Sequence, residues 1–298
     1  MGKKVCLLNV IKSKILRTDF LCKLILCMAL IISKLYFAVH YINLEYRGLG
    51  TEEPNIYMYL LMAFSDPSMA YYFVLIAFAI LIADIVYEEY LTKNLFIKYG
   101  TRKNLYFGML KLTLVFSFLF LFLFVLLAFI VGSCGGLSFS FEYTKEAILL
   151  LGEEQEFYIL RTTAIYVPVS ILKYNSLLIL GIVIFKYYVG LVLLSMIGLV
   201  FSIKKDNVQY GICAILLTVL LNIAVLDYVG PWNFYKIGIS IDLSEIFSYV
   251  TLQRFFIFDF AGIKKDVIMV FGDTMLTGAI WFVLLSAVIY RMIRKKDF

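Results

Sequence analysis

The stretch that decides the fold runs from Asp84 to Lys111 and reads DIVYEEYLTKNLFIKYGTRKNLYFGMLK. It is the most polar part of a very apolar chain, and it stands between two long hydrophobic runs. Leu91, Leu95 and Tyr99 recur at four-residue spacing, which predicts a short helix with one apolar stripe. The stretch therefore indicates a short extramembrane helix between two membrane spans.

A turn is expected directly after this helix. Gly100 can end a helix, because glycine adopts the left-handed C′ conformation at little cost. Thr101 is a natural N-cap for a new helix that continues through Leu105 into the next span. The pattern is helix, tight turn, helix, on the side of the membrane that carries the lysines. On spacing alone, the simplest interpretation is an ordinary basic loop that joins two spans.

The composition of the chain is that of a membrane protein. It is 63% hydrophobic and only 16% charged, with a mean hydropathy of +0.93. Soluble domains carry about 25% charged residues, so we expect a polytopic membrane protein. Its five cysteines form no CxxC pair, and no disulfide framework is expected. The first apolar run is interrupted by lysines and lacks a cleavage site, which argues against a cleavable signal peptide.

The hydrophobic runs predict an all-α protein with a single transmembrane domain over residues 1–298. Residues 1–20 are basic and amphipathic, as in a helix that lies in the membrane interface. The outer regions 43–69, 132–175 and 230–274 are expected to be partly helical. In the second of them, EYTKEAILLLGEEQEFYIL predicts two helices with a glycine break between them. Six spans are predicted, at about 24–42, 70–86, 107–131, 177–203, 210–229 and 275–290.

The distribution of charge predicts the orientation of the chain. The segments assigned to the cytoplasm hold 17 of the 27 lysines and arginines, whereas most acidic residues fall in the outer regions. This is the positive-inside pattern, and an even number of spans places both basic termini in the cytoplasm. The inner segments are 1–23, 88–111, 204–209 and 291–298.

Several kinds of chemistry have no motif in this sequence. It contains no GxxxxGK[ST] loop, so the chain has no motif of its own for cradling ATP phosphates. Its one histidine, His40, belongs to no HExxH motif or Cys/His cluster. We therefore expect no catalytic residue, no metal site, no directly bound cofactor and no nucleic acid, and any energy for transport must come from a partner.

Charged residues inside the predicted spans are candidates for a structural role within the membrane. Such a charge costs roughly 2.5–3.5 kcal/mol at the centre of a span, so each needs a partner or a polar cavity. Lys34 and Asp84 fall at depths that would allow an ion pair between the first two spans. Lys186 is the third candidate, although the simpler interpretation is that its long stem carries the ammonium to the membrane surface.

The loop between the second and third spans resembles that of permease subunits in type-2 ABC exporters. There a glutamate pair leaves the membrane, a short coupling helix follows, and a Tyr-Gly-(Ser/Thr)-Arg-Lys turn leads into the third span. The C-terminal sequence YRMIRKKDF is also similar to the end of that class. The matching residues, which the resemblance implies dock an ATPase, are Glu88, Glu89, Leu91, Leu95, Lys98, Tyr99, Gly100, Thr101, Arg102 and Lys103.

The resemblance implies a function. The chain would be the membrane half of a bacterial exporter in the cytoplasmic membrane, paired with a second permease subunit, identical or different. A separate cytoplasmic ATPase subunit would bind ATP and Mg²⁺ and drive movement of a hydrophobic or amphipathic cargo, for which antimicrobial-peptide export or immunity is one possibility. The alternative is a non-transporting membrane scaffold or sensor that uses the same basic segment to recruit a cytoplasmic partner.

Overall fold

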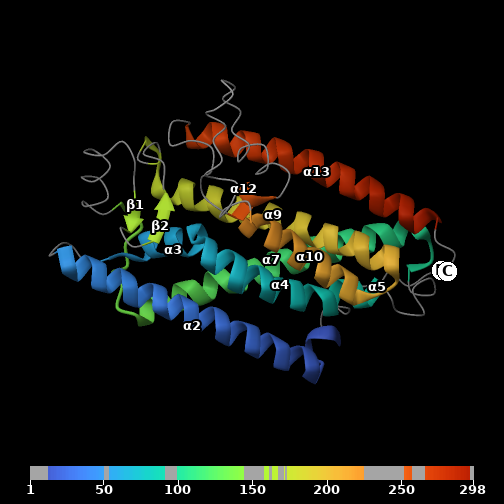
Figure 1. The fold of residues 1–298 in the computed structure, drawn as a ribbon, viewed down its shortest axis with the longest axis horizontal. Coiled ribbons are helices and arrows are strands. Elements are labelled where there is room, and N and C mark those ends of the chain that lie inside the picture. Colours follow the sequence, from blue (N-terminus) through green and yellow to red (C-terminus); the bar gives the residue numbers. More distant parts are fainter. Residues whose placement is uncertain are drawn as a thin grey trace.

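The computed structural model in Figure 1 shows an elongated bundle of long helices. The longest are α2 (Thr18–Leu49), α7 (Arg102–Cys134), α9 (Ser176–Lys205) and α13 (Val267–Lys295). The helix α10 (Val208–Ala224) follows α9 after a tight turn in which Asp206 adopts a left-handed conformation. The structure describes residues 13–49, 54–90, 99–143, 158–160, 163–166, 171, 173–224, 252–256 and 266–295.

The second membrane segment is an interrupted helix rather than a continuous one. The helix α3 (Ile56–Ser65) ends at Asp66, whose extended ψ of 111° is the conformation that the following Pro67 favours. The chain resumes as the π-helical turn η1 (Met69–Val74), continues as α4 (Leu75–Ile82), and passes through a second π-helical turn, η2 (Ala83–Tyr87), into α5 (Glu88–Tyr90).

Within residues 43–69, which were predicted to form an outer region, α3 packs into the protein, and all ten of its residues are buried. A buried helix start must have its backbone N–H groups satisfied. Asn55 caps it by accepting a hydrogen bond from the Met58 N–H (2.9 Å), and the Ile56 N–H donates to the Ser138 carbonyl (3.0 Å). The chain after α7 therefore folds back and supplies a hydrogen-bond acceptor to the N-terminus of α3.

A short antiparallel hairpin lies in the predicted outer region 132–175. Its strands are β1 (Tyr158–Leu160) and β2 (Thr163–Tyr166). The prediction of a helix running through Tyr158–Leu160 was wrong, because the backbone of these residues pairs with β2 instead. The remainder of the predicted helical pair, residues 144–157, lies outside the described residues.

The helices are arranged with α2 and α13 on opposite edges of the bundle and the others between them (Figure 1). α13 packs on α9, whereas α2 packs on α7 and α4. Most of the large side chains on the outer faces of α2 and α13 are apolar and exposed, among them Ile25, Leu26, Leu276 and Val283. Apolar residues on the outside and a continuous apolar core inside are the pattern of a protein surrounded by lipid.

Five helices are long and apolar enough to cross a membrane, by length and composition: Thr18–Leu44 within α2, Met69–Tyr90, α7, α9 and α13. They correspond to five of the six predicted spans, and their helices begin earlier or end later than predicted. α10 covers the first part of the predicted fifth span in a helix of 17 residues, and residues 225–229 lie outside the described residues. The described chain is thus a predominantly helical, multi-pass membrane protein.

Part of the predicted outer region 230–274 lies inside the bundle. The four-residue helix α12 (Gln253–Phe256) is buried along its whole length. At Gly190 of α9, an added Cβ would lie 2.6 Å from the Phe255 Cβ and 2.7 Å from the Phe256 ring. At Gly278 of α13, it would lie 3.1 Å from the Phe255 ring, which is a tight contact. The two glycines therefore make room for a segment that enters between α9 and α13.

Candidate functional site

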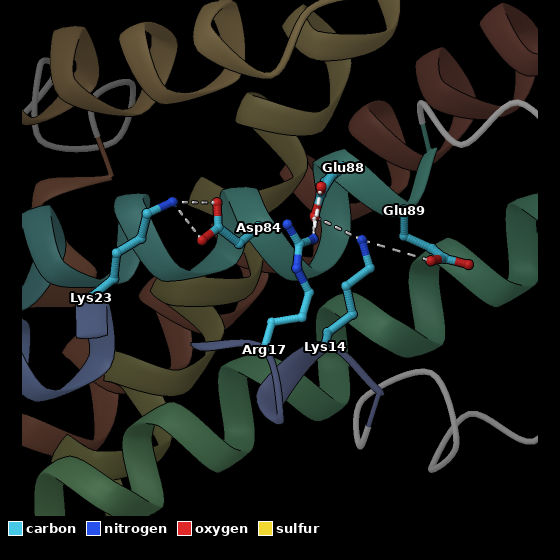
Figure 2. Close-up of polar contacts among 6 residues, drawn as sticks. All are labelled: Lys14, Arg17, Lys23, Asp84, Glu88 and Glu89. Atoms are coloured by element: carbon cyan, nitrogen blue, oxygen red, sulfur yellow. Dashed lines mark hydrogen bonds and ion pairs between the residues drawn. The ribbon is translucent and has the colours of Figure 1, made fainter. Parts of the chain in front are cut away.

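The candidate site begins where the second membrane segment ends, at the glutamate pair in α5. The Glu88 carboxylate accepts a hydrogen bond from Lys14 Nζ at 2.8 Å and two from Arg17 Nη1 at 2.8 and 2.7 Å. Figure 2 shows both basic side chains reaching the same carboxylate from the start of the chain. The segment before α2 is therefore fastened to the exit of the second membrane segment.

Glu89 faces the interior. Only 3% of its side chain is exposed, and its carboxylate lies 4.0 Å from Lys14 Nζ (Figure 2). Burial and the neighbouring Glu89 carboxylate raise the pKa of Tyr99, which lies at the far end of the predicted coupling helix. Glu89 and Tyr99 thus bring the two ends of this segment close together.

The turn into the third span has the geometry that its sequence predicted. Gly100 has a positive φ of 73°, and Thr101 Oγ1 accepts a hydrogen bond from the Asn104 N–H at 3.1 Å as the N-cap of α7. Both local predictions are confirmed. The Tyr99 ring packs so closely on Gly108 that a Cβ there would lie 2.4 Å from it, which fixes the turn against the first two turns of α7.

The first residue of α7 also contacts the C-terminal helix. The Arg102 guanidinium donates a hydrogen bond to the backbone carbonyl of Arg294, in the last turn of α13. Lys103 is exposed beside it. A basic side chain near free carbonyls at a helix C-terminus is electrostatically favourable, so this contact stabilises the end of α13.

The three remaining residues with a predicted docking role, Leu91, Leu95 and Lys98, lie outside the described residues, as does the rest of 91–98. The structure brings together the others at one end of the bundle: Glu88, Glu89, Tyr99, Gly100, Thr101, Arg102 and Lys103. The coupling helix itself therefore stays a prediction.

The predicted ion pair between Lys34 and Asp84 was wrong. Asp84 pairs instead with Lys23, whose Nζ lies 2.7 Å from the carboxylate (Figure 2), and Lys34 pairs with Asp66 at 3.5 Å. Lys23 and Lys34 are eleven residues apart, or about 16 Å along a helix, so one acid cannot serve both. Lys186, expected to extend to the membrane surface, is buried within α9, with 6% of its residue surface exposed.

Sequence reasoning missed the basic partners of Glu88 and the half-buried position of Asp66 within the bundle. A signal for the second was present, because Asp66-Pro67 interrupts a sequence that is apolar from Ile56 to Phe64 and again from Met69. No comparable signal existed for Lys14 and Arg17, since many basic residues share the first 23 positions.

Among the described residues, no group of three or more His, Cys, Asp or Glu side chains could hold a metal ion. Comparison with protein-family models, with curated proteins and with solved structures gives no match to this chain. The class of protein follows from the fold alone: a helical protein with several helices able to cross a membrane and a charged, hydrogen-bonded cluster at one end.

Proposed function

We propose that this chain is the membrane-spanning half of an ATP-driven exporter of the type-2 ABC class. It would have six spans, with α10 as the core of the fifth, and both termini in the cytoplasm. The segment 91–98 would be the coupling helix that docks on a separate ATPase subunit. The chain would work as a dimer in a bacterial cytoplasmic membrane and move a hydrophobic or amphipathic cargo.

One observation carries this proposal: both borders of the segment 91–98 are attached to distant parts of the bundle. On one side, Glu88 binds Lys14 and Arg17 ahead of α2. On the other, Arg102 binds the Arg294 carbonyl at the end of α13. A displacement of this segment by a partner would pull on α2, α4, α7 and α13 together. These attachments would give the segment a route for passing such a displacement to the bundle, as a coupling element requires.

The segment's apolar stripe supports a docking surface. Leu91 and Leu95 lie at four-residue spacing with Tyr99 in the sequence, between charged borders. An amphipathic helix at this place needs an apolar groove on a partner, with the charged rim setting its register. The partner would bind ATP and Mg²⁺, for which this chain has no motif of its own.

The first test is docking. A soluble P-loop ATPase encoded beside this chain is co-expressed with it, and Leu95→Asp is compared with the unchanged chain by pull-down from detergent. We expect Leu95→Asp to insert normally and to lose the ATPase. Phe139→Asp is the matched control, because Phe139 is an exposed apolar residue beyond the far end of α7. Full retention of the ATPase by Leu95→Asp would reject the docking role.

The second test separates docking from coupling. Arg102→Ala removes the bond to the end of α13 and leaves the apolar stripe intact. We expect the ATPase to remain bound while its stimulation by cargo is lost. If the variant kept normal cargo-stimulated ATP hydrolysis, the attachments at the borders of the segment would play no part in coupling the ATPase to the bundle. That result would favour the non-transporting scaffold instead.

A further inference from the structure

A pair of opposite charges lies at the interruption of the second membrane segment. Lys34 Nζ lies 3.5 Å from an Asp66 carboxylate oxygen, and their side chains are 28% and 15% exposed on the face of the bundle. Lys34 occupies the middle of α2 (Thr18–Leu49), so the pair lies near the centre of a membrane-crossing helix. A carboxylate at this depth is costly unless a cation accompanies it.

The backbone presents this carboxylate in a defined way. Pro67 breaks the helix, and the Asp66 oxygens accept hydrogen bonds from the Ser68 N–H at 2.8 Å and the Ser68 hydroxyl at 2.9 Å. These neutral donors orient the carboxylate but do not neutralise its negative charge. Among the described residues, Lys34 is the basic residue that pairs with Asp66. Its Nζ–carboxylate distance of 3.5 Å is longer than that of a strong charge-assisted hydrogen bond.

Aromatic rings lie on the inner side of the pair. Tyr187 of α9 is close enough to Asp66 to interact with it electrostatically, and its ring contacts Phe64 at a centroid distance of 5.4 Å and Phe256 at 5.1 Å. Phe124 lies 5.0 Å from Phe64 in the same cluster. The faces of such rings attract cations, more strongly where water is excluded.

Two hydroxyl groups in this cluster are buried and lack a hydrogen-bond partner within the described part of the chain. Tyr187 Oη is buried and has no hydrogen-bond partner among the residues that the structure describes, and the same holds for the Oη of the neighbouring Tyr71 in η1. A buried hydroxyl destabilises the fold unless a ligand or water completes its hydrogen bonds. The cluster therefore combines an oriented carboxylate, several aromatic rings and two hydroxyls that a bound group could satisfy.

We propose that the Asp66 carboxylate, together with the Tyr71 and Tyr187 hydroxyls, forms a binding site for the cationic head of an amphipathic organic molecule, and that the Lys34 ammonium pairs with this carboxylate when no ligand is present. The partly exposed edge of the pair gives access from the acyl chains, where the apolar part of such a molecule would lie. This inference names the cargo class and so rests on the proposed function, but the binding step requires no ATPase.

Binding is measured on the purified chain alone in phosphatidylcholine nanodiscs, by equilibrium dialysis with empty nanodiscs subtracted. The probes are tetraphenylphosphonium and tetraphenylborate, which share shape and hydrophobicity and differ in charge. The variants are Lys34→Met and the double variant Lys34→Met with Asp66→Asn, in which the asparagine oxygen can still accept from Ser68. The pair of variants has matched packing, and the double variant avoids an unpaired lysine.

We expect Lys34→Met to bind tetraphenylphosphonium about tenfold more tightly than the unchanged chain, because the internal competitor is gone. The double variant should lose that affinity by about tenfold or more, while tetraphenylborate binding changes less than twofold. Equal binding of the cation by the two variants would overturn the proposal and leave Asp66 as the cap of a helix break. A parallel loss of both probes would also overturn it, since charge would then play no part.

The hydroxyl of Tyr187 is tested with a second pair of probes. Hexylammonium can donate hydrogen bonds to it, whereas hexyltrimethylammonium cannot. Tyr187→Phe should weaken hexylammonium binding about fivefold and leave hexyltrimethylammonium unchanged; an equal effect on both would exclude the hydroxyl from the site. These results do not depend on ATPase docking, so loss of the partner in the Leu95→Asp pull-down would leave them unchanged.

Discussion

Lys23 Nζ lies 2.7 Å from the Asp84 carboxylate, and this ion pair joins the start of α2 to the π-helical turn η2. Lys34, farther along α2, meets Asp66, which precedes η1. The earlier lysine pairs with the later acid because the two segments run in opposite directions. Asp66 and Asp84 are therefore each paired with a different lysine of α2.

A double-mutant cycle distinguishes this arrangement from the alternative pairing. Lys23→Met and Asp84→Asn should be coupled in thermal stability by about 0.2–1 kcal/mol, the range for partly exposed ion pairs. Lys34→Met and Asp84→Asn should be additive, because Lys34 contacts Asp66. Melting temperatures of the unchanged chain, the three single variants and the two double variants in detergent provide the measurement, and coupling between positions 34 and 84 would contradict the structure.

The contacts of Glu88 predict protection of the N-terminal segment from protease. In Glu88→Gln the carboxylate that holds Lys14 and Arg17 is lost, so trypsin should cleave after these residues about fivefold faster, equivalent to ~1 kcal/mol of easier local opening. Glu142→Gln is the control, because Glu142 is an exposed glutamate that lies beyond the far end of α7. Mass spectrometry of timed digests gives the rates, and equal rates would argue against the clamp.

The packing of α10 on α9 predicts a position that tolerates no methyl group. A Cβ at Gly211 would lie 2.1 Å from Ser202 Oγ and 2.7 Å from the Gly198 carbonyl, which belongs to the backbone and cannot rotate away. Gly211→Ala should therefore destabilise the protein by about 1–3 kcal/mol. Gly181→Ala, in α9 with open space around it, should be neutral or stabilising. Similar melting temperatures for both variants would refute the close approach.

The contact between Tyr174 and Asp266 predicts a dependence on pH. The Ile268 N–H and the Tyr174 hydroxyl donate to the Asp266 carboxylate at 2.9 Å and lower its pKa. A lowered folded-state pKa adds stability above the ordinary value of about 3.9, and this stability is lost as pH falls through the folded pKa.

Asp266→Asn should remove that contribution. Between pH 6 and about pH 3, the unchanged protein should lose more melting temperature than the variant, and the two curves should approach each other at the acid end. Scanning fluorimetry at half-unit steps measures the difference. A constant offset across the whole range would mean that the carboxylate of Asp266 has no titrating role in the fold.

Thiol labelling tests the proposed orientation. In a chain with its native cysteines changed to alanine, Asn207→Cys in the turn between α9 and α10 should react only with membrane-permeant reagents. Glu142→Cys, beyond the far end of α7, should react with an impermeant reagent in intact cells. Impermeant labelling of position 207 would reject the six-span arrangement.

The sequence by itself determined the class of this protein and the turn into α7. Long apolar runs predict membrane helices because a buried backbone must satisfy its own hydrogen bonds. The local chemistry of Gly100 and Thr101 predicted a left-handed residue and an N-cap, and both occur. These features depend on neighbouring residues alone, so they can be read without knowledge of what packs on what.

Only the tertiary structure decided which charges meet and which segments of the predicted outer regions are buried. Acidic residues lie at several depths along the segment that follows α2. The position of α2 along that segment places Lys34 beside Asp66. The same packing buries α3 and α12, whose sequences were expected to lie in outer regions. The physical reason is that the depth of a side chain in the bundle depends on where the neighbouring helices begin and on how closely they approach one another. Gly190 and Gly278 are examples of such close approach. No local sequence pattern encodes the distance between two helices.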